Sequence, residues 1–218
     1  MEDCLILEKF ILGPLQTNTY FYQEPGGICL LFDPAFSSKE LDIILAKNKL
    51  SAIFLTHGHI DHFMGLSHYK DLTNAPILIH KNDAECLINP RKNLSAYFLQ
   101  NFSHKAADII LNDNQLYLFQ SGYEIKAIYT PGHTPGSISY YDSKNSILFS
   151  GDFIFDQNIG RTDFPGGDIF EMQKSLQTII QLPDSTHVFP GHGDSFFLGD
   201  FKPTAKSIIE EITNAGNE

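Results

Sequence analysis

The chain has 218 residues, 42% hydrophobic and 19% charged, a composition typical of a folded domain and not of a disordered or collagen-like protein. Fifteen lysines and arginines stand against 26 acidic residues, giving a formal net charge of −11. This charge disfavours binding to nucleic-acid phosphates, although a cleft can still receive a small anionic substrate. We expect a single domain over residues 1–218, because no Gly- or Ser-rich linker divides the chain.

The cysteines and the N-terminal residues favour a cytoplasmic protein. The chain has three cysteines, Cys4, Cys29 and Cys86. An odd number of cysteines without a CxxC pair fits a reducing compartment. The first residues are acidic and do not resemble a signal peptide. No apolar run approaches the roughly 18 residues that would predict a membrane span.

The predicted elements of the first half begin with strands. Apolar runs broken by turns predict three strands, over residues 4–10, 19–23 and 28–32. Ser38 is suited to cap a helix that includes Leu41 and Leu45. Further elements are expected in the order strand, helix, strand and helix, over residues 52–55, 65–72, 76–80 and 83–88.

The second half is predicted to repeat this order. Residues 89–113 are polar and mixed, with a helix expected over 94–102. Strands are then predicted over residues 115–119, 123–129, 137–141 and 147–149, and a short one at 188–189. A helix is expected over 169–180, and Pro203 is expected to open a terminal helix. Two similar halves predict a layered α/β sandwich with the helices outside.

The strongest local signal is Thr56-His57-Gly58-His59-Ile60-Asp61-His62, which follows a short apolar strand. Imidazole and carboxylate are ligands for divalent metals such as zinc. A turn between a strand and a helix lets His57 and His59 point one way. Asp61 and His62 then point another, so one loop can serve two adjacent ions. A solvated polar loop is the alternative, and four ligand types at this spacing argue against it.

Three more residues share this setting, in which a turn containing glycine follows a strand end. They are His133, Asp152 and His192. Ligands and chemistry gather at strand ends in α/β proteins. Each residue alone would be more typical of a structural hydrogen bond, but together with the histidine cluster they predict a metal site.

On these residues the sequence resembles the metallo-β-lactamase superfamily over almost its whole length. The resemblance implies a four-layer αββα sandwich with a binuclear metal site between the sheets. By this pattern one ion would be held by His57, His59 and His133. The second would be held by Asp61, His62 and His192, and Asp152 would bridge the two. The resemblance implies two divalent ions, with zinc favoured and iron or manganese as alternatives.

Branches of this superfamily differ at single residues. The β-lactamases proper lack the bridging aspartate, and flavo-diiron proteins usually carry Glu where this chain has His59. Members that process nucleic acids carry an additional domain or exosite, for which this acidic chain leaves little room. The segment from Gly160 to Asp168, GRTDFPGGD, resembles a loop of short glyoxalase II-like hydrolases and persulfide dioxygenases. Pro165 favours the hydrolases.

Arg161 in this loop is one of two arginines, the other being Arg91. A guanidinium fork suits a substrate carboxylate, so Arg161 is a candidate for substrate binding. The competing interpretation, which we favour slightly, is an internal ion pair with Asp163 or Asp168 that fixes the loop.

The expected activity is hydrolysis of a small thioester, S-D-lactoylglutathione or a similar acylglutathione, as in hydroxyacylglutathione hydrolases. The resemblance implies attack by a hydroxide bound to the metals, with Asp61 as the residue that orients it. One alternative is a mononuclear iron persulfide dioxygenase that uses His57, His133 and Asp152. Another is a lactone or ester hydrolase. The expected partner is a small molecule, neither nucleic acid nor membrane, and the oligomeric state stays open.

Overall fold

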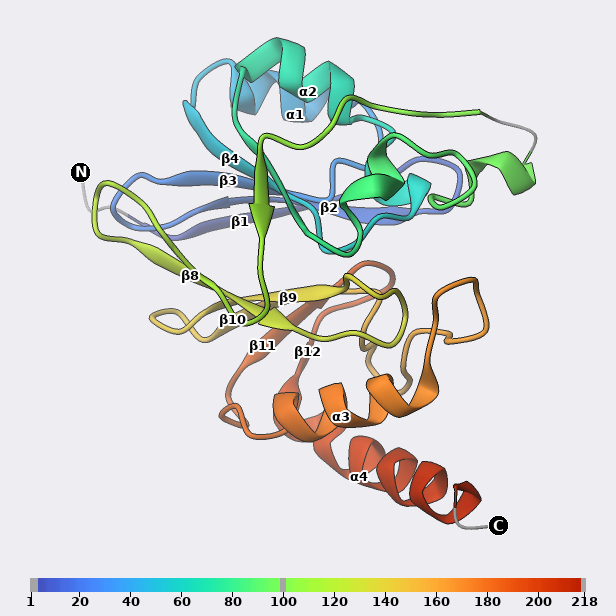
Figure 1. Cartoon of the computed structure of the whole chain (residues 1–218). Helices are drawn as coiled ribbons and strands as arrows, with labels where there is room; N and C mark the ends of the chain where they lie inside the picture. The colour runs from blue at the N-terminus through green and yellow to red at the C-terminus, as the bar shows by residue number, and fades with distance from the viewer. Residues whose placement is uncertain (1–3, 99–100, 217–218) are drawn as a thin grey trace.

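A computed structural model describes residues 4–98 and 101–216. Figure 1 shows four layers, in which two sheets lie face to face and a pair of helices covers the outer side of each. This is the α/β sandwich expected from the sequence. None of the described helices is long and apolar enough to cross a membrane.

The first half of the chain forms one sheet, whose strands lie side by side in chain order. They are β1 (Ile6–Leu12), β2 (Thr17–Gln23), β3 (Cys29–Phe32), β4 (Leu50–Phe54), β5 (Ile77–His80) and β6 (Ile109–Leu111). The first three strands are antiparallel, and β3 to β6 are parallel. Its outer face is covered by α1 (Lys39–Leu45), which Ser38 caps as expected, and by α2 (Leu66–Thr73). The parallel strands bring several carboxyl ends to one edge.

The second half forms the other sheet, again with neighbouring strands in chain order. They are β7 (Leu116–Leu118), β8 (Glu124–Tyr129), β9 (Ile138–Asp142), β10 (Ile147–Gly151), β11 (His187–Pro190) and β12 (Phe196–Phe197). The pair β10 and β11 is parallel. The outer helices of this half are α3 (Ile169–Ile179) and α4 (Leu198–Ala215).

Aromatic side chains fill the space between the sheets. The rings of Phe32 and Phe149, from opposite sheets, are stacked with centroids 3.9 Å apart, and Phe54 stacks on Phe32 at 5.3 Å. Separate apolar clusters lie between each sheet and its helices. Burial of this kind contributes roughly 25 cal/mol per Å² of apolar surface, so the sandwich is a rigid support for the loops at its edge.

Several short elements differ from the sequence prediction. The helix expected over 83–88 is a single 3-10 turn, η2 (Ala84–Leu87), and that expected over 94–102 is η3 (Ser95–Phe98), with residues 99–100 outside the described part. Strands β6 and β12 were not predicted, because runs of three and two residues carry little periodicity. The terminal helix begins at Leu198, so Pro203 lies inside it and does not open it.

Candidate metal centre

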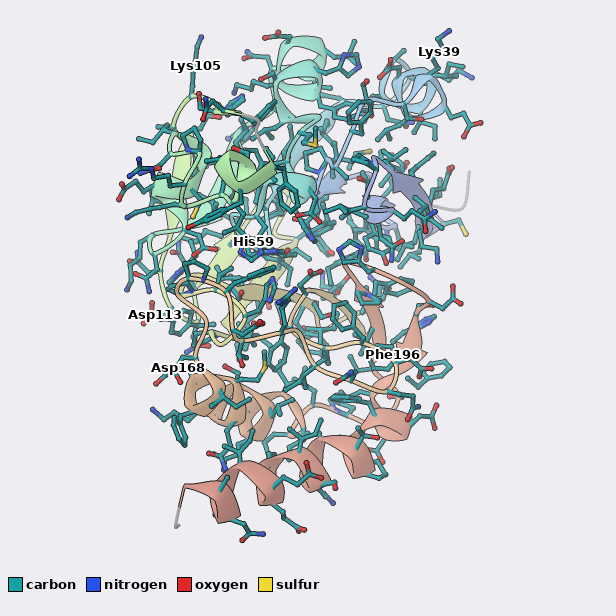
Figure 2. All side chains as sticks on the ribbon, turned by 90° about the vertical axis from the view of Figure 1, so that its right-hand side faces the viewer. Lys39, His59, Lys105, Asp113, Asp168 and Phe196 are labelled. Atoms are coloured by element: carbon teal, nitrogen blue, oxygen red, sulfur yellow. The ribbon has the colours of Figure 1, made fainter. Side chains whose placement is uncertain are left out.

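All seven predicted ligand residues lie in loops at the carboxyl ends of strands. The 57–62 loop, which includes the 3-10 turn η1 (Ile60–His62), follows β4 in the first sheet. The other three residues, His133, Asp152 and His192, follow β8, β10 and β11 in the second sheet. Figure 2 shows His59 at the seam between the two halves of the sandwich. Residues more than a hundred positions apart are thus brought to one place.

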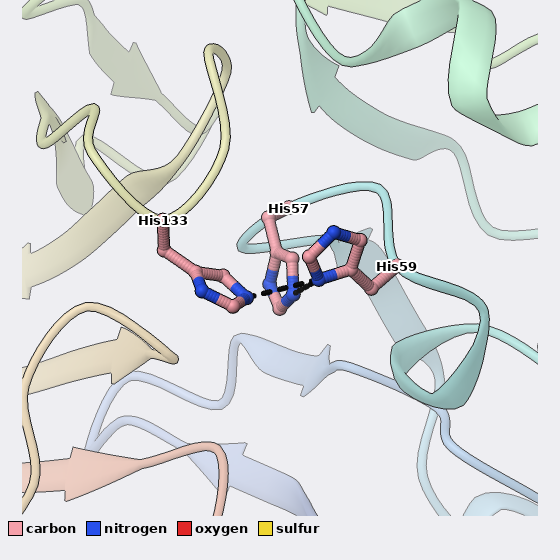
Figure 3. Close-up of side chains that lie close together, drawn as sticks. All are labelled: His57, His59 and His133. Atoms are coloured by element: carbon pink, nitrogen blue, oxygen red, sulfur yellow. Dashed lines mark hydrogen bonds between the residues drawn. The ribbon is translucent and has the colours of Figure 1, made fainter. Parts of the chain in front are cut away.

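A first group consists of three buried imidazoles. Nε2 of His57 and Nε2 of His133 lie 3.1 Å and 2.9 Å from Nδ1 of His59. Figure 3 shows the three rings converging, with His59 presenting Nδ1 to the other two. All three side chains are buried. The group therefore offers three nitrogen donors at one point, as expected from the sequence.

A second group lies beside the first and opens to solvent. Nε2 of His62 and Nε2 of His192 lie 3.5 Å and 3.4 Å from Oδ2 of Asp61. His62 is fully buried, whereas the side chain of His192 is 30% exposed. His192 therefore marks the mouth of the site.

Asp152 lies between the two groups. Its Oδ1 is 3.3 Å from Nε2 of His62, and its Oδ2 is 3.7 Å and 3.5 Å from Nε2 of His133 and His192. One carboxylate thus faces imidazoles of both groups. This is the placement that a bridging ligand requires.

The first group is electrically suited to a cation. Burial, together with the neighbouring imidazoles, holds the pKa of His57 well below its usual range and lowers the pKa of His59 to about 3. Both rings are therefore neutral at physiological pH. Neutral imidazole is the form that ligates a metal.

The second group contains charged side chains, unlike the first. Burial opposes ionisation of Asp61, but the imidazoles of His62 and His192 outweigh it and lower the pKa of this carboxyl to about 2. Burial likewise opposes protonation of His192, yet Asp152 and Asp61 raise its pKa to about 9. The carboxylates are thus ionised at neutral pH and supply the negative charge that a divalent ion needs.

Two buried atoms test whether these residues fit a metal. Within the described residues, Nε2 of His62 and Oδ1 of Asp152 have no hydrogen-bond partner although both are inaccessible to solvent. Buried polar atoms without partners are rare, because each costs about 1–3 kcal/mol. The two atoms lie 3.3 Å from each other, and together with His57 they form a group of ligand atoms within 4.8 Å that a divalent cation would satisfy. The donor set therefore fits a metal pair.

Comparison with known proteins agrees with this geometry. The model of the metallo-beta-lactamase superfamily matches residues 12–192, a span that contains all seven candidate ligands. The chain belongs to the metallo-beta-lactamase superfamily. Its fold therefore implies binding of divalent metal ions, and its histidines form the candidate site.

Several of the similar proteins carry hydrolase names. The chain is 32% identical over 187 residues to a probable metallo-hydrolase, YqgX, of Bacillus subtilis, which covers 84% of this chain and 87% of the relative. It is 30% identical over 166 residues to the hydroxyacylglutathione hydrolase GloC of Haemophilus influenzae, which covers 75% of this chain and 76% of that protein. These likenesses indicate a metallo-hydrolase.

A solved structure of the superfamily is also similar. BLEG-1, described as a B3 metallo-beta-lactamase, superposes with a TM-score of 0.84 at 33% identity and covers 89% of this chain and 95% of its own. The likeness extends over both sheets and therefore supports the whole architecture.

Two carboxylates outside the predicted set support the ligand loops of this superfamily member. Oδ2 of Asp33 lies 2.9 Å from Nδ1 of His62 and accepts a hydrogen bond from Oγ1 of Thr56. Asp83 accepts hydrogen bonds from the backbone N–H of Gly58 and from Oγ1 of Thr134, and so joins the two loops of the first group. Sequence analysis missed both residues. The signal that could have found them is their position just after buried strands.

Arg161 lies at the cavity beside these ligands, but its guanidinium is engaged. It donates two hydrogen bonds of 2.7 Å to the carboxylate of Asp163 and stacks 3.8 Å from the ring centroid of Phe164. This is the internal pair weighed in the sequence analysis, formed with Asp163 and not with Asp168. Asp168 instead caps α3. Both functional groups of the pair are exposed, so the contact orders the loop more than it stabilises the fold.

The cavity over the metal residues has a volume of about 470 Å³. His59, Asp61, His133, Asp152 and His192 form its polar floor. Its walls are largely apolar and come from three separate connections between elements: Leu15, Leu94, Phe98, Phe155 and Phe164. We call it the metal cavity. A small molecule with one polar reacting group fits such a space.

Proposed function

We propose that this superfamily member hydrolyses a small thioester, with S-D-lactoylglutathione or a similar acylglutathione as the first substrate to test. The observation that carries the proposal is the convergence of seven candidate metal-ligand side chains, five of which form the floor of an apolar-walled cavity. The name of the relative GloC, a hydroxyacylglutathione hydrolase, supports the choice of thioester.

Two divalent ions are the proposed cofactors, with zinc favoured over iron and manganese. They would be held by His57, His59 and His133 on one side, by Asp61, His62 and His192 on the other, and by Asp152 between them. Bound ions of this kind lower the pKa of a water molecule and polarise a carbonyl oxygen.

Asp61 is the residue proposed to orient the attacking water. Its Oδ2 accepts a hydrogen bond of 3.0 Å from Oγ1 of Thr17, which fixes the direction of the carboxylate. Because its pKa lies at about 2, Asp61 is ionised at neutral pH. Its carboxylate can accept a hydrogen bond from the attacking water and so direct the water oxygen toward the carbonyl carbon of the substrate.

The departing group of a thioester suits this site. A thiol has a pKa of about 8.5, so a thiolate leaves without a strong general acid. Water adds to the carbonyl carbon, the carbon–sulfur bond breaks, and the products are a carboxylic acid and a thiol. The apolar walls of Phe155 and Phe164 exclude bulk water from the acyl group during these steps.

A covalent thiol mechanism has no support among the described residues. Cys29 and Cys86 are buried, burial raises the pKa of both, and that of Cys86 reaches about 12. None of the three cysteines lines the metal cavity. The proposed nucleophile is therefore water.

Hydrolysis is tested by following the loss of thioester absorbance of S-D-lactoylglutathione on protein reconstituted separately with zinc, manganese and iron. We expect turnover that a chelator abolishes, and that His59→Gln or Asp152→Ala abolishes together with metal binding. His68→Gln is the matched control, because His68 lies on α2 and pairs with exposed Asp42. Unimpaired hydrolysis by Asp152→Ala would contradict the proposal.

A second candidate is the iron-dependent oxidation of a persulfide. The predicted ligands are His57, His133 and Asp152: ligand atoms of His57 lie within 4.8 Å of those of both other residues, and Nε2 of His133 lies 3.7 Å from Oδ2 of Asp152. Two imidazoles with one carboxylate form a donor set used by mononuclear iron oxygenases. Oxygen consumption with glutathione persulfide, without thioester hydrolysis, would favour this candidate. If the protein hydrolyses a lactone, an ester or a β-lactam but no thioester, the proposed substrate class is wrong and the metal-dependent hydrolysis is retained.

A further inference from the structure

A second hollow lies beside the metal cavity, on the other side of His59. It has a volume of about 390 Å³, and its walls include Asn82, Arg91, Lys92, Tyr97 and Pro165. His59 lines both spaces, so they adjoin at a metal ligand. We call this hollow the Arg91 pocket.

Aromatic side chains link the two spaces. A smaller hollow of about 200 Å³ shares Phe98 and Phe164 with the metal cavity, and Tyr97 and Pro165 with the Arg91 pocket. Its surface is almost entirely apolar. Tyr97 is 67% exposed and Phe98 is 59% exposed. Neighbouring aromatic rings that remain open to solvent are typical of a surface that covers a ligand.

The Arg91 pocket carries positive charge in a protein of net charge −11. Lys92 is paired with Glu85 at 2.6 Å. The guanidinium of Arg91 forms no ion pair within the part of the chain that the structure describes. The carboxylate of Asp83 in the same wall is buried and accepts hydrogen bonds from Gly58 and Thr134, so it does not neutralise Arg91. Arg91 therefore retains its donors for an anion.

The other arginine cannot take this role without losing a contact. Nε and Nη2 of Arg161 already donate to the carboxylate of Asp163, and its flat face covers Phe164. Of the two arginines in the chain, Arg91 is therefore the one whose planar fork is free to bind a carboxylate in two-point fashion.

We propose that the Arg91 pocket binds an anionic group of the thiol carrier, while the acyl group reacts in the metal cavity and an uncharged part of the carrier crosses the rings of Tyr97 and Phe98. This inference rests on the proposed thioesterase function and narrows its substrate to thioesters of acidic thiols. Arg91 is a specificity residue that acts on binding and does not touch the reacting carbonyl.

The test compares three D-lactoyl thioesters that differ only in the thiol. The thiols are glutathione, which carries carboxylates, coenzyme A, which carries phosphates, and N-acetylcysteamine, which is uncharged. We expect Arg91→Gln to lower kcat/KM for the glutathione thioester about tenfold, through KM, the effect of losing one charge-assisted contact. For the uncharged thioester, kcat/KM of Arg91→Gln should stay within twofold of the wild-type value. A loss confined to the coenzyme A thioester would keep the anion site and assign it to phosphate.

A matched control separates a local contact from the overall charge. Lys47→Gln makes the same change in net charge at an exposed position just after α1, far from both cavities. This substitution should leave kcat/KM unchanged for all three thioesters. Equal losses by Arg91→Gln on charged and uncharged thioesters, or no loss on any, would overturn the proposal.

A binding measurement tests the Arg91 pocket independently of thioester hydrolysis. S-methylglutathione has the carboxylates of glutathione and no free thiol, so calorimetry on the metal-loaded protein reports binding without turnover. We expect wild type to bind it at least fivefold more tightly than Arg91→Gln, with a difference that shrinks as salt rises. If no thioester is hydrolysed but this difference persists, the proposed function fails and the anion site stands. Equal binding by the two proteins overturns the site itself.

Discussion

Buried carboxylates behind the ligands decide how firmly the metal loops are held. Asp33 accepts the backbone N–H of Thr56 through Oδ1 while Oδ2 faces His62 and the Thr56 hydroxyl. A carboxylate in this position fixes the tautomer of the imidazole, so that Nε2 of His62 is free to bind metal.

Asp33→Asn replaces one of the two acceptor oxygens by an NH2 donor and removes the negative charge while preserving size. We expect the affinity for the second metal ion to fall about 10–100-fold, the usual effect of losing a partner of a ligating histidine. Competition with a chromophoric chelator measures it. Asp42→Asn is the control, since Asp42 pairs with His68 at 2.7 Å on the exposed surface. Equal affinities in the two variants would show that the Asp33 contact does not support the site.

The three cysteines should differ sharply in reactivity. Cys4 is exposed, whereas Cys29 and Cys86 are buried. With its pKa raised to about 12 by burial, Cys86 stays a thiol throughout the working pH range, and the thiol form does not react. We expect a disulfide reagent at pH 8 to titrate one thiol in the native protein and three after denaturation. Activity should survive the first reaction, because Cys4 lies outside the ligand set.

At the residue scale, the sequence predicted the candidate ligands but not the carboxylates that support them. The Thr56–His62 cluster stands out because imidazoles are scarce and their chemistry is specific. Asp33 and Asp83 do not stand out, because a single aspartate after a strand also suits an ordinary turn. Arg161 was ambiguous for a similar reason, since its partner Asp163 is a matter of loop geometry that spacing does not determine.

Among the elements, α3 has a direct part in placing a ligand. Oγ of Ser175 on α3 donates to the carbonyl of Pro131 at 2.6 Å, and the N–H of Asp168 donates to the carbonyl of Gly132 at 2.8 Å. Gly132 has φ of +141°, and a Cβ there would lie 2.6 Å from Cα of Met172. Only glycine lets the helix approach this closely, and the close approach positions His133.

Gly132→Ala should therefore cost both stability and metal binding. We expect a loss on the order of 2 kcal/mol or more from backbone strain and overpacking, with weaker binding at the first metal site. Chemical denaturation and metal titration measure the two effects. Gly122→Ala is the control, because Gly122 also has positive φ, at +84°, but no atom within 4 Å of the added Cβ. It should lose stability alone; weaker metal binding in both variants would argue against a specific role for α3.

Longer elements were predictable and the shortest were not. Strands such as β4 and β10 contain runs of three apolar residues, and α1 and α3 have capping residues at their starts. The helices predicted over 83–88 and 94–102 are instead 3-10 turns at Ala84–Leu87 and Ser95–Phe98, because segments this short carry too little periodicity to separate the two. Pro203 suggested a helix start, yet α4 accommodates it in its second turn.

On the scale of the whole molecule, the metal residues tie two sheets together. Four candidate ligands come from the first sheet and three from the second. Nearby, the hydroxyl of Tyr20 donates to the carbonyl of Pro190 at 2.7 Å, and that of Tyr140 to Leu55 at 2.8 Å. These cross-sheet hydrogen bonds align the loops before any ion binds. The similar order of elements in the two halves predicted the layered arrangement, and the family resemblance predicted which loops would meet.

Removal of metal should therefore loosen the contact between the halves. A ligand present at about a thousand times its Kd stabilises the folded state by roughly 4 kcal/mol, which corresponds to about 10 °C in a domain of this size. We expect excess chelator to lower Tm by about this amount. The shift should be much smaller in His59→Gln. If chelator leaves the Tm of the wild type unchanged, metal binding does not stabilise the fold.

The division of ligands between the sheets also bears on how the protein is made. His62 precedes His192 by 192 − 62 = 130 residues, and the whole second sheet up to β11 lies between them. A chain emerging from the ribosome thus displays its first four candidate ligands long before the remaining three exist. The complete donor set requires His192 and the docking of the two sheets, so we expect loading with metal to be a late event in biogenesis.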